Sequence, residues 1–542
     1  MFTTDVLIVG AGPAGLATAL SALRHGARVL VVERRAGPST VPRATGISIH
    51  TMEVLRGWGV ADAALRGSIA CEPTVTITDR LPDPPHEVVP LPWPPVREIL
   101  AASPALPAVI PQDHLEPVLV DEVRRLGGTV RFGAALTALR ATGDGVRAIV
   151  GGVRVRARFV VGADGPRSTV RAALGIGVER LGVIGEFTLT LFRADGMPSQ
   201  PSALNFVKHP DAEGVLLPLG SGRWGYVRAG REPSQAALAL AVGRAPDVLG
   251  TSRFTMAAEV AGAFRAGPGF LVGDAAHRMT PYAGAGLNTA VHDGHELGWR
   301  LAWAARGIAG DGLLSSYATE REPVGRATAL RSLSTERHPD DGLPRDLGGT
   351  YRSAVIVDDG AAPATGHHRT ARPGERAPHA WFRDGGLRRS TLDLFEGRMT
   401  VLAGPEGRWV PVGSGEGDRA DSGRAAWGGW ADHAPDEPPG LADGGHPDSK
   451  RGASGGRSEP AGSVGSGGCI DGVPVAVLRV GRDLPDPRGV IRRAYRLGAE
   501  SAVLVRPDGV VAWRHDGAAD PAALVSAVRA AVGRAVPAAV AV

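Results

Sequence analysis

The chain has 542 residues, of which 43% are hydrophobic, and its 60 Lys and Arg against 56 Asp and Glu give a formal net charge of +4. This length exceeds one compact core, so two or three domains are expected. The balanced charge gives no sign of nucleic-acid binding, and two cysteines without a CxxC pair exclude a disulfide framework and a cysteine zinc site. The sequence shows neither a signal core nor an apolar run able to span a bilayer, which predicts a cytoplasmic protein without a membrane partner.

The N-terminus reads as a strand, a helix and a second strand. Residues 5–9 (DVLIV) form a short apolar run typical of a buried parallel strand. A helix is expected over residues 13–25, and a second strand over residues 29–32. This order predicts the opening of a nucleotide-binding sheet.

A GxGxxG motif joins the first strand to the helix. Gly10 allows the tight turn, Gly12 lets the backbone approach a pyrophosphate, and Gly15 permits close packing of helix on strand. The helix start, with Pro13 and Ala14, offers free N–H groups to phosphates. Glu33, at the end of the second strand, is placed to accept from ribose hydroxyls. The motif predicts a dinucleotide site but does not separate NAD from FAD.

The middle of the chain contains both helical patterns and strand-like apolar runs. A helix interrupted early by Pro117 is expected over residues 113–126, and buried strands over residues 159–161 and 270–272. From about residue 184 to 229, short strand-like runs separated by Gly, Pro and Asp predict an inserted antiparallel sheet. Further helices are expected at residues 287–305 and 313–338.

A linker rich in Pro and Gly, residues 358–378, opens a third unit. Its expected elements are strands at residues 399–403, 473–480, 502–505 and 510–513 and a helix at residues 521–532. Residues 413–468 contain almost no aliphatic side chains, and Trp427 and Trp430 are their only large aromatic residues. Such a composition cannot offset the entropy of ordering, so this insertion is predicted to be disordered.

Two later motifs each follow a buried strand. Residues 162–168 read GADGPRS, and Gly273-Asp274 begins a stretch that continues to Asn288. Asp274 can accept hydrogen bonds from a polyol such as a ribityl chain, and the glycine-rich turn lets backbone N–H groups approach a ring. The helix that starts near Gly286 favours negative charge at its N-terminus, which suits a reduced flavin.

These motifs resemble the FAD monooxygenases related to para-hydroxybenzoate hydroxylase. The resemblance rests on GAGPAG with Glu33, on GADGPRSTVR, and on GDAAHRMTPYAGAGLNTAVHDGHELGWRLAW. It is closest to the actinobacterial branch that hydroxylates aromatic polyketides and carries a C-terminal thioredoxin-like domain. PRATG at residues 42–46, Pro111-Gln112, and RPGERAPHAWF, STLDLF and SAVLVRPDGVVAWR near the C-terminus also match. The resemblance covers nearly all of the chain outside residues 413–468.

The resemblance implies an α/β fold in three parts. A discontinuous Rossmann-like FAD-binding domain is expected over residues 1–72, 106–178 and 262–357. A substrate-binding antiparallel-sheet domain is expected over residues 73–105 and 179–261. A thioredoxin-like α/β domain would follow over residues 358–542 and contain the disordered insertion.

The resemblance also implies roles for single residues. Arg34 would lie by the adenosine, Leu136 by the adenine, and Asp164 in a motif that serves both FAD and the nicotinamide. Arg43 and Gln112 would contact the phosphate and ribityl regions. The expected FAD-binding residues are Gly10, Gly12, Pro13, Ala14, Gly15, Glu33, Arg34, Arg43, Gln112, Leu136, Asp164, Gly273, Asp274, Pro281, Gly284, Gly286, Leu287 and Asn288. Arg43, Pro281 and Tyr282 are the candidates for a catalytic role, although the flavin would dominate the chemistry.

The implied reaction is hydroxylation of a phenolic polycyclic aromatic through a flavin C4a-hydroperoxide, with non-covalent FAD, O2, and NADPH or NADH as transient reductant. The protein would be a monomer or a homodimer. Baeyer–Villiger insertion or epoxidation on the same fold stays an alternative, as does a flavin-binding accessory protein of a biosynthetic complex. Two departures from relatives concern the substrate side: Tyr-Ala-Gly-Ala-Gly replaces Gly-Gly-Gln-Gly, and His50 stands where Arg is common.

Other candidates favour structural interpretations. His292, His295 and Glu296 share helical spacing, but a solvated helix face is favoured over a metal site, and no metal is predicted. His277 is expected to be a packed, hydrogen-bonded residue, and Trp299 and Trp303 to belong to the core. Trp224 fits a substrate wall or the sheet core equally well. No nucleophile elbow supports hydrolysis.

Overall fold

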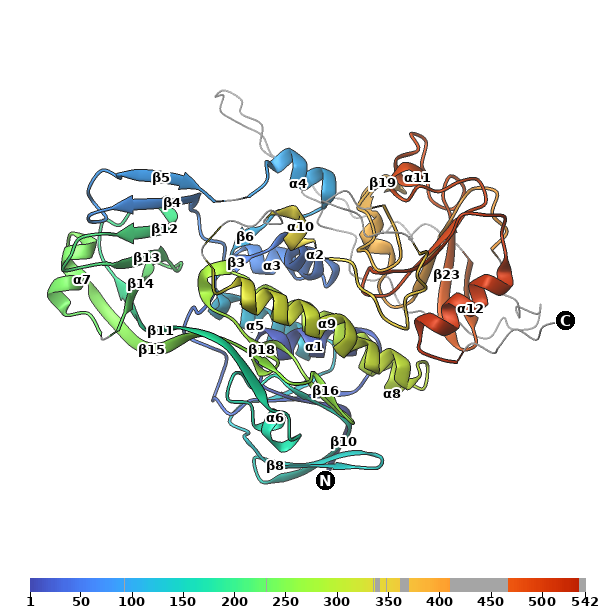
Figure 1. Ribbon diagram of the computed structural model, residues 1–542, viewed down its shortest axis with the longest axis horizontal. Coiled ribbons are helices and arrows are strands. Elements are labelled where there is room, and N and C mark those ends of the chain that lie inside the picture. The colour runs from blue at the N-terminus through green and yellow to red at the C-terminus, as the bar shows by residue number, and fades with distance from the viewer. Residues whose placement is uncertain are drawn as a thin grey trace, which may run out of the picture.

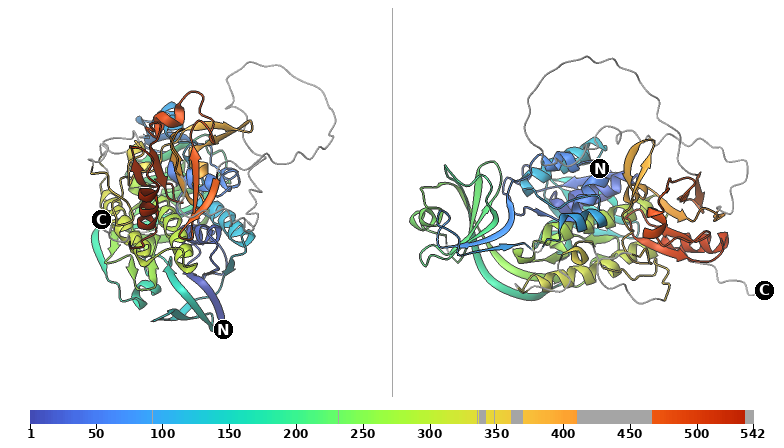
Figure 2. Two further views of the ribbon diagram at one scale, coloured as in Figure 1. Left: turned by 90° about the vertical axis from the view of Figure 1, so that its right-hand side faces the viewer. Right: turned by 90° about the horizontal axis from the view of Figure 1, so that it is seen from above.

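The computed structural model describes residues 1–91, 93–230, 232–334, 336, 342–347, 349–360, 370–409 and 466–535. Figure 1 shows three units side by side: an antiparallel sheet on the left, a central unit around a parallel sheet, and a C-terminal unit on the right. The view from above places the two outer units at opposite ends of the central one (Figure 2). Most of the predicted disordered insertion lies outside the described residues, and residues 466–468 at its end begin a strand.

The central sheet has the strand order β16-β17-β10-β1-β2-β7, and β9 and β8 extend it from β10. β1 pairs in parallel with both β2 and β10, and β10 with β17, so segments far apart in sequence meet in one layer. Its strands are β1 (Phe2–Val9), β2 (Val29–Val32), β7 (Thr129–Arg131), β8 (Leu136–Thr142), β9 (Gly145–Val150), β10 (Val153–Gly162), β16 (Arg265–Ala266) and β17 (Gly269–Leu271).

Two helices, α1 (Pro13–Arg24) and α8 (Gly286–Ala305), cross each other closely beside this sheet. Gly294 and Gly298 of α8 face α1, and a Cβ on either would lie 2.6 Å or less from a backbone oxygen of α1. Only glycine permits this approach. Farther along α8, Trp299 and Trp303 are fully buried, as expected for core residues.

The central unit also contains further helices and short strands. α5 begins at Gln112 and runs through Pro117 without the expected interruption. These elements are β3 (Gly46–Ile47), α2 (Ile49–Gly57), α3 (Ala61–Leu65), α4 (Val96–Ala102), β6 (Ala108–Val109), α5 (Gln112–Arg125), α6 (Thr169–Ala173), η1 (Gly273–Ala275), η2 (Pro281–Ala283), α9 (Asp311–Arg331) and α10 (Leu343–Asp346).

The second sheet confirms the predicted antiparallel insertion, and its strand order is β18-β15-β11-β14-β13-β12-β4-β5. Trp224 packs with Phe192, Leu216 and Tyr226 in a core on one face of this sheet, so it is a core residue and not a substrate wall. The elements are β4 (Glu72–Thr78), β5 (Glu87–Pro90), β11 (Val178–Arg193), β12 (Ser202–Val207), β13 (Gly214–Pro218), β14 (Arg223–Ala229), α7 (Gln235–Val242), β15 (Asp247–Ala261) and β18 (His277–Arg278).

The C-terminal unit is built on a mixed sheet of order β22-β23-β21-β24-β25. Trp299, Trp303 and Leu313 of the central unit share one apolar cluster with Met399 and Val475 of this sheet, so the two units are packed together. The elements are β19 (Trp381–Asp384), β20 (Leu387–Ser390), η3 (Thr391–Leu394), β21 (Met399–Ala403), β22 (Ser466–Ile470), β23 (Val473–Arg479), α11 (Val490–Ala494), β24 (Ala502–Val505), β25 (Val511–His515) and α12 (Pro521–Ala531).

The expected three-part α/β fold is therefore confirmed. The residue boundaries predicted for the three domains remain our proposal. No helix within the described ranges is long and apolar enough to cross a membrane.

Candidate active site

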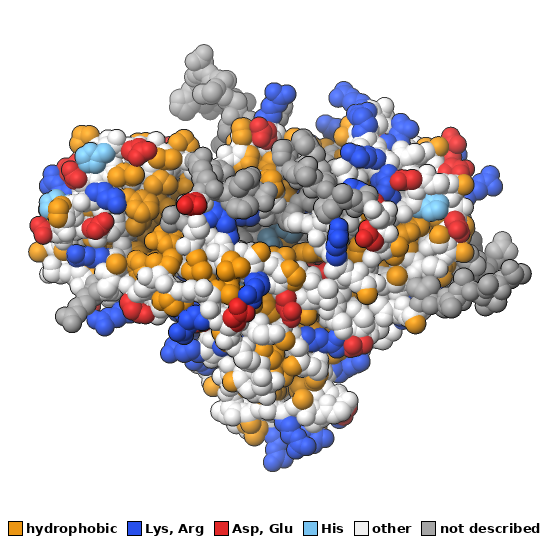
Figure 3. Space-filling view, viewed as in Figure 1, with side chains coloured by type: hydrophobic (Ala, Val, Ile, Leu, Met, Phe, Trp, Pro, Cys, Tyr) orange, Lys and Arg blue, Asp and Glu red, His pale blue; other side chains and the backbone are white. Residues whose placement is uncertain are grey.

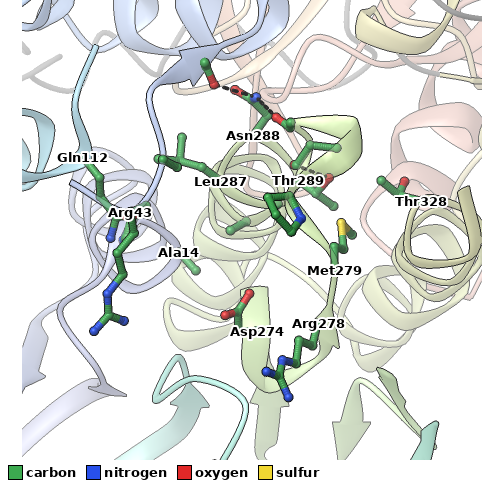
Figure 4. Close-up of a pocket in the computed structure, with 18 of the residues that line it drawn as sticks. Ala14, Arg43, Gln112, Asp274, Arg278, Met279, Leu287, Asn288, Thr289 and Thr328 are labelled. Atoms are coloured by element: carbon green, nitrogen blue, oxygen red, sulfur yellow. Dashed lines mark hydrogen bonds between the residues drawn. The ribbon is translucent and has the colours of Figure 1, made fainter. Parts of the chain in front are cut away.

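One cavity of about 2320 Å³ runs from the glycine-rich turn after β1 to the antiparallel sheet and to the C-terminal unit. Every residue predicted for the site lines it except Gly15 and Gly273, which lie just behind its wall. Figure 4 shows Gln112 and Arg43 on one side of the space, Asp274 and Arg278 below, and Leu287 and Asn288 above. The sequence motifs thus come together around one space.

The glycine-rich turn has the geometry that its sequence predicts. Gly10 has φ +111°, and a Cβ there would lie 2.2 Å from the carbonyl oxygen of Ala163. A Cβ on Gly15 would lie 2.0 Å from the oxygen of Gly10. Nothing lies within 4 Å of a Cβ built on Gly12, which borders the cavity. The backbone at Gly12 is therefore open to a ligand at the N-terminus of α1, as a pyrophosphate requires.

Glu33 holds this turn in place. Its Oε2 accepts from the Ala11 N–H at 3.0 Å, and its Oε1 accepts from the backbone N–H and Nε of Arg35 at 2.9 and 3.1 Å. Desolvation raises the pKa of Glu33, but these hydrogen bonds outweigh it and leave the pKa lowered. Arg35, and not the exposed Arg34, is thus the partner of Glu33. A contact with ribose remains a prediction.

Two further predicted residues are engaged with their own helices. Asp164 accepts from the Ser168 hydroxyl and from the Thr169 N–H at 2.6 Å, which places it at the start of α6. Gln112 donates to Glu116 at 2.7 Å, and Glu116 also accepts from the Ser39 N–H at 2.7 Å. Sequence reasoning missed Glu116 because it lies within a helix and outside any motif.

Asp274 follows β17 and opens into the cavity while protein surrounds it on the other sides. Its carboxylate accepts no hydrogen bond from any described residue, and burial raises its pKa. The preceding turn is held from behind, since Asp293 accepts from the Gly273 N–H at 3.0 Å and from His277 Nε2 at 2.6 Å. His277 is therefore the hydrogen-bonded structural residue that was expected. An unpartnered carboxylate here fits a polyol.

The loop at the N-terminus of α8 is fixed by Asn288. Its Nδ2 donates to the oxygens of Gly46 and Gly284, both at 3.0 Å, and its Oδ1 accepts from the Ser48 N–H at 2.9 Å. Gly284 has φ +58°, and Tyr282 on the same loop is 47% exposed. The first residues of α8 thus line the cavity from a braced loop, and the N-terminus of a helix favours negative charge.

The antiparallel sheet provides an apolar part of the cavity wall, which we name the sheet wall. Apolar side chains also gather over this unit on the surface in Figure 3. Polar residues at its base were missed from the sequence: Arg278 donates to the Thr255 oxygen at 2.6 Å and lies 3.7 Å from Glu259. The sheet wall consists of Val75, Val89, Leu189, Leu204, Phe206, Val215, Leu217, Leu219, Val227, Phe254 and Met256.

The opposite end of the cavity is polar and lies between α2, α8 and the C-terminal unit. We name it the interdomain lobe; it consists of His50, His292, His295, Glu296, Arg321, Tyr351, Arg376 and Asp508. The predicted solvated helix face is wrong, because His292 and His295 face this lobe and Glu296 is only 3% exposed. The reason is that α2 and the C-terminal unit cover this side of α8. No metal-binding group of three or more His, Cys, Asp or Glu is found in the described part of the chain.

The donor set fits FAD. A bare backbone at Gly12 faces the start of α1, an unpartnered carboxylate at Asp274 suits ribityl hydroxyls, and the start of α8 suits an electron-rich ring. The sheet wall adds an apolar space to the same cavity.

Comparison with known proteins agrees with this assignment. Residues 3–332 match the family described as "FAD binding domain", and residues 470–535 match "Aromatic-ring hydroxylase, C-terminal". The chain is 36% identical to aklavinone 12-hydroxylase DnrF of Streptomyces peucetius over 74% of this chain and 92% of that protein. It is 31% identical to tetracenomycin B2 monooxygenase-dioxygenase of Streptomyces olivaceus, over 97% and 98% of the two chains.

A solved structure of aklavinone-11 hydroxylase in a ternary complex with FAD and aklavinone is similar over the whole length. It superposes with a TM-score of 0.79 at 31% identity, covering 98% of this chain and 99% of that one.

Proposed function

The chain belongs to the FAD-binding aromatic-ring hydroxylases and is a flavin-dependent monooxygenase, and from this premise we propose that it hydroxylates a phenolic, polycyclic aromatic polyketide with NADPH or NADH and O2. Bound FAD would supply electron transfer from the nicotinamide and the activation of oxygen. The residues of the chain would position the cofactor, orient the ring and exclude water.

The observation that carries this proposal is the continuity of the cavity. Ordinary ligand sites have volumes of about 300–1,000 Å³, and the cavity here has about 2320 Å³. A space of this size supports a dinucleotide and a second large ligand in contact. The glycine-rich turn, Asp274 and the start of α8 would hold the cofactor at one end.

The sheet wall supports a flat, apolar substrate. Leu204, Leu217 and Val227 present side chains from three neighbouring strands, so a fused aromatic ring system could lie against them. Arg278 and Glu259 at the base provide a few polar contacts that could fix its orientation. The names of the relatives point the same way, since an aklavinone 12-hydroxylase and a tetracenomycin B2 monooxygenase-dioxygenase are among them.

Incorporation of labelled oxygen tests the proposal. Purified protein should contain FAD that acid precipitation releases in full, and it should oxidise NADPH or NADH slowly alone and faster with 1,8-dihydroxyanthraquinone or a related polycyclic phenol. Under ¹⁸O2 the product should carry one labelled atom in a new phenol. A labelled lactone would favour Baeyer–Villiger insertion, and peroxide formation without labelled product from any phenol offered would reject hydroxylation.

A further inference from the structure

The interdomain lobe contains buried polar atoms without a protein partner. Glu296 Oε1 accepts from Tyr351 Oη at 2.6 Å and from Arg321 Nη1 at 3.2 Å. Glu296 Oε2 and His295 Nδ1 are buried and have no hydrogen-bond partner among the described residues. Leaving a hydrogen bond unmade at such depth is unfavourable, so these atoms are expected to meet water or a ligand in the cavity.

The charges around Glu296 are matched without it. Arg321 also pairs with Asp293 at 2.9 Å, while Arg300 and Arg506 pair with Glu320 and Asp508. All of these side chains are at most 9% exposed. Ionised Glu296 would therefore be an additional negative charge in a buried network, which is unfavourable.

Glu296 and Asp293 both pair with Arg321, but their pKa values are shifted in opposite directions. Burial raises the pKa of Glu296, whereas the charges of His277 and Arg321 outweigh burial and lower the pKa of Asp293 to about 2. Several other titratable groups surround Glu296. Those that interact with it electrostatically are Tyr351, Tyr317, Arg300, Arg321, Glu320 and Asp508, and His292 and His295 line the same lobe. Neighbouring titratable groups whose pKa values are shifted apart are typical of acid–base pairs in active sites.

Glu296 also has a connection to the proposed flavin site. Asn288, His292 and Glu296 follow one face of α8 at intervals of four residues, so Glu296 lies about 12 Å along the helix from the flavin loop. His292 lies between them, with its Nε2 3.0 Å from Thr51 Oγ1 and its ring centroid 4.2 Å from that of His50. Neutral imidazoles both donate and accept, and together with waters they could carry a proton over this distance.

We propose that Glu296 is a neutral acid that delivers to the cavity, through His292, His50 and water, the proton that the reaction consumes. The inference rests on the proposed function. In each turnover the nicotinamide hydride and one solvent proton reduce one oxygen atom to water, while the other oxygen atom enters an aromatic C–H bond as a hydroxyl. Glu296 would give up that proton and regain it from solvent on the side of Tyr351.

The first test needs neither FAD nor turnover. Infrared difference spectra of the apoprotein, wild type minus Glu296→Gln, should show the carbonyl band of a protonated carboxylic acid at pH 7. A difference spectrum that shows carboxylate bands and no carboxylic-acid band would overturn the proposal. Glu375→Gln is the matched control, because Glu375 is also buried, also has an unpartnered oxygen, and does not line the cavity.

The second test uses the FAD-loaded enzyme. Glu296→Gln should slow labelled-product formation by about 100-fold, the scale of a lost proton donor, and should remove a limb of its pH profile, while FAD content stays at the wild-type level. Glu375→Gln should keep the wild-type pH profile. An unchanged profile in Glu296→Gln would overturn the inference while leaving hydroxylation intact. Absence of hydroxylation in wild type would reject the proposed function, and the infrared band would still decide the state of Glu296.

Discussion

The cavity has two walls of opposite chemistry. The sheet wall presents aliphatic and aromatic side chains from strands of one antiparallel sheet, and it requires no hydrogen-bond partners. The interdomain lobe presents histidines, arginines and carboxylates from α2, α8, α9 and the C-terminal unit. Behind the lobe, the side chains of Arg300, Glu320 and Arg506 are completely buried.

The two walls differ in which substitutions they tolerate. An apolar wall tolerates changes of similar volume, because burial depends on area and shape. A buried ionic wall is stable only while every charge is paired, since a single unpaired charge is costly. Unpartnered atoms such as Glu296 Oε2 are therefore informative in the lobe, whereas a gap in the sheet wall only indicates space for a ligand.

The largest expected effect comes from breaking the ionic network. Arg506 donates to Glu320 at 2.8 and 2.9 Å and to Asp508 at 2.7 Å. Arg506→Met should lower the free energy of unfolding by about 3–5 kcal/mol, because two carboxylates lose a buried partner. Denaturant titration of the purified protein measures this change. A loss below 1 kcal/mol would show that the network contributes little to joining the two units.

Two adjacent leucines on β13 allow the effect of the sheet core on stability to be measured apart from the effect of the sheet wall on ligand binding. Leu216 is fully buried in the sheet core, and Leu217 lines the cavity. Leu216→Ala should cost about 2–5 kcal/mol of stability and leave binding of a polycyclic phenol nearly unchanged. Leu217→Ala should cost clearly less stability and weaken that binding. Melting temperatures and fluorescence titration check both, and the reverse pattern would contradict the assignment of faces.

Acid should weaken the lobe before it affects the sheet wall. Burial lowers the pKa of His292 to about 3 and of His295 to about 4, below the ordinary value of 6.5. The unfolded chain therefore takes up protons first, and the stability present above pH 6.5 is lost as the pH falls toward 4. Each histidine contributes about 1.4 kcal/mol per pH unit. His295→Gln should reduce the slope of stability against pH between 6.5 and 4, and an unchanged slope would refute this.

The smallest effect is expected for an ion pair outside both walls. Arg326 and Glu179 lie 2.7 Å apart on the surface, where 47% and 54% of their side chains are exposed. Water screens such pairs, so Arg326→Gln should leave the melting temperature unchanged. A fall comparable to that of Arg506→Met would remove the distinction between buried and exposed pairs.

Sequence patterns predicted the parts of this protein that depend on local rules. The glycines at 10, 12 and 15 have the predicted geometry because turn, approach and packing each leave a local signature. The antiparallel insertion was also placed correctly, as were the four strands and the helix predicted for the C-terminal unit, whereas β19, β20, η3, β22 and α11 were missed.

Sequence patterns did not predict the burial and contacts of residues that are covered by segments distant in the sequence. Glu296 was assigned to a solvated face because its helical spacing does not reveal that residues more than fifty positions later cover it. Glu116 lies in an ordinary helical context, and only the folded chain brings it to Ser39. Trp224 could not be assigned to a face of its strand until the packing of α7 was known.

The hydrogen bonds made by the Asn288 side chain have a consequence for synthesis on the ribosome. They join α8 to Gly46 and Ser48, about 240 positions earlier, while β1 also waits for β10 and then β17 to complete its sheet. At about 5–20 residues per second, the first glycine-rich turn exists for tens of seconds before its partners emerge. The complete set of residues proposed to hold FAD therefore exists only after Asn288 has emerged, and nascent chains that stop short of it are expected to retain no flavin.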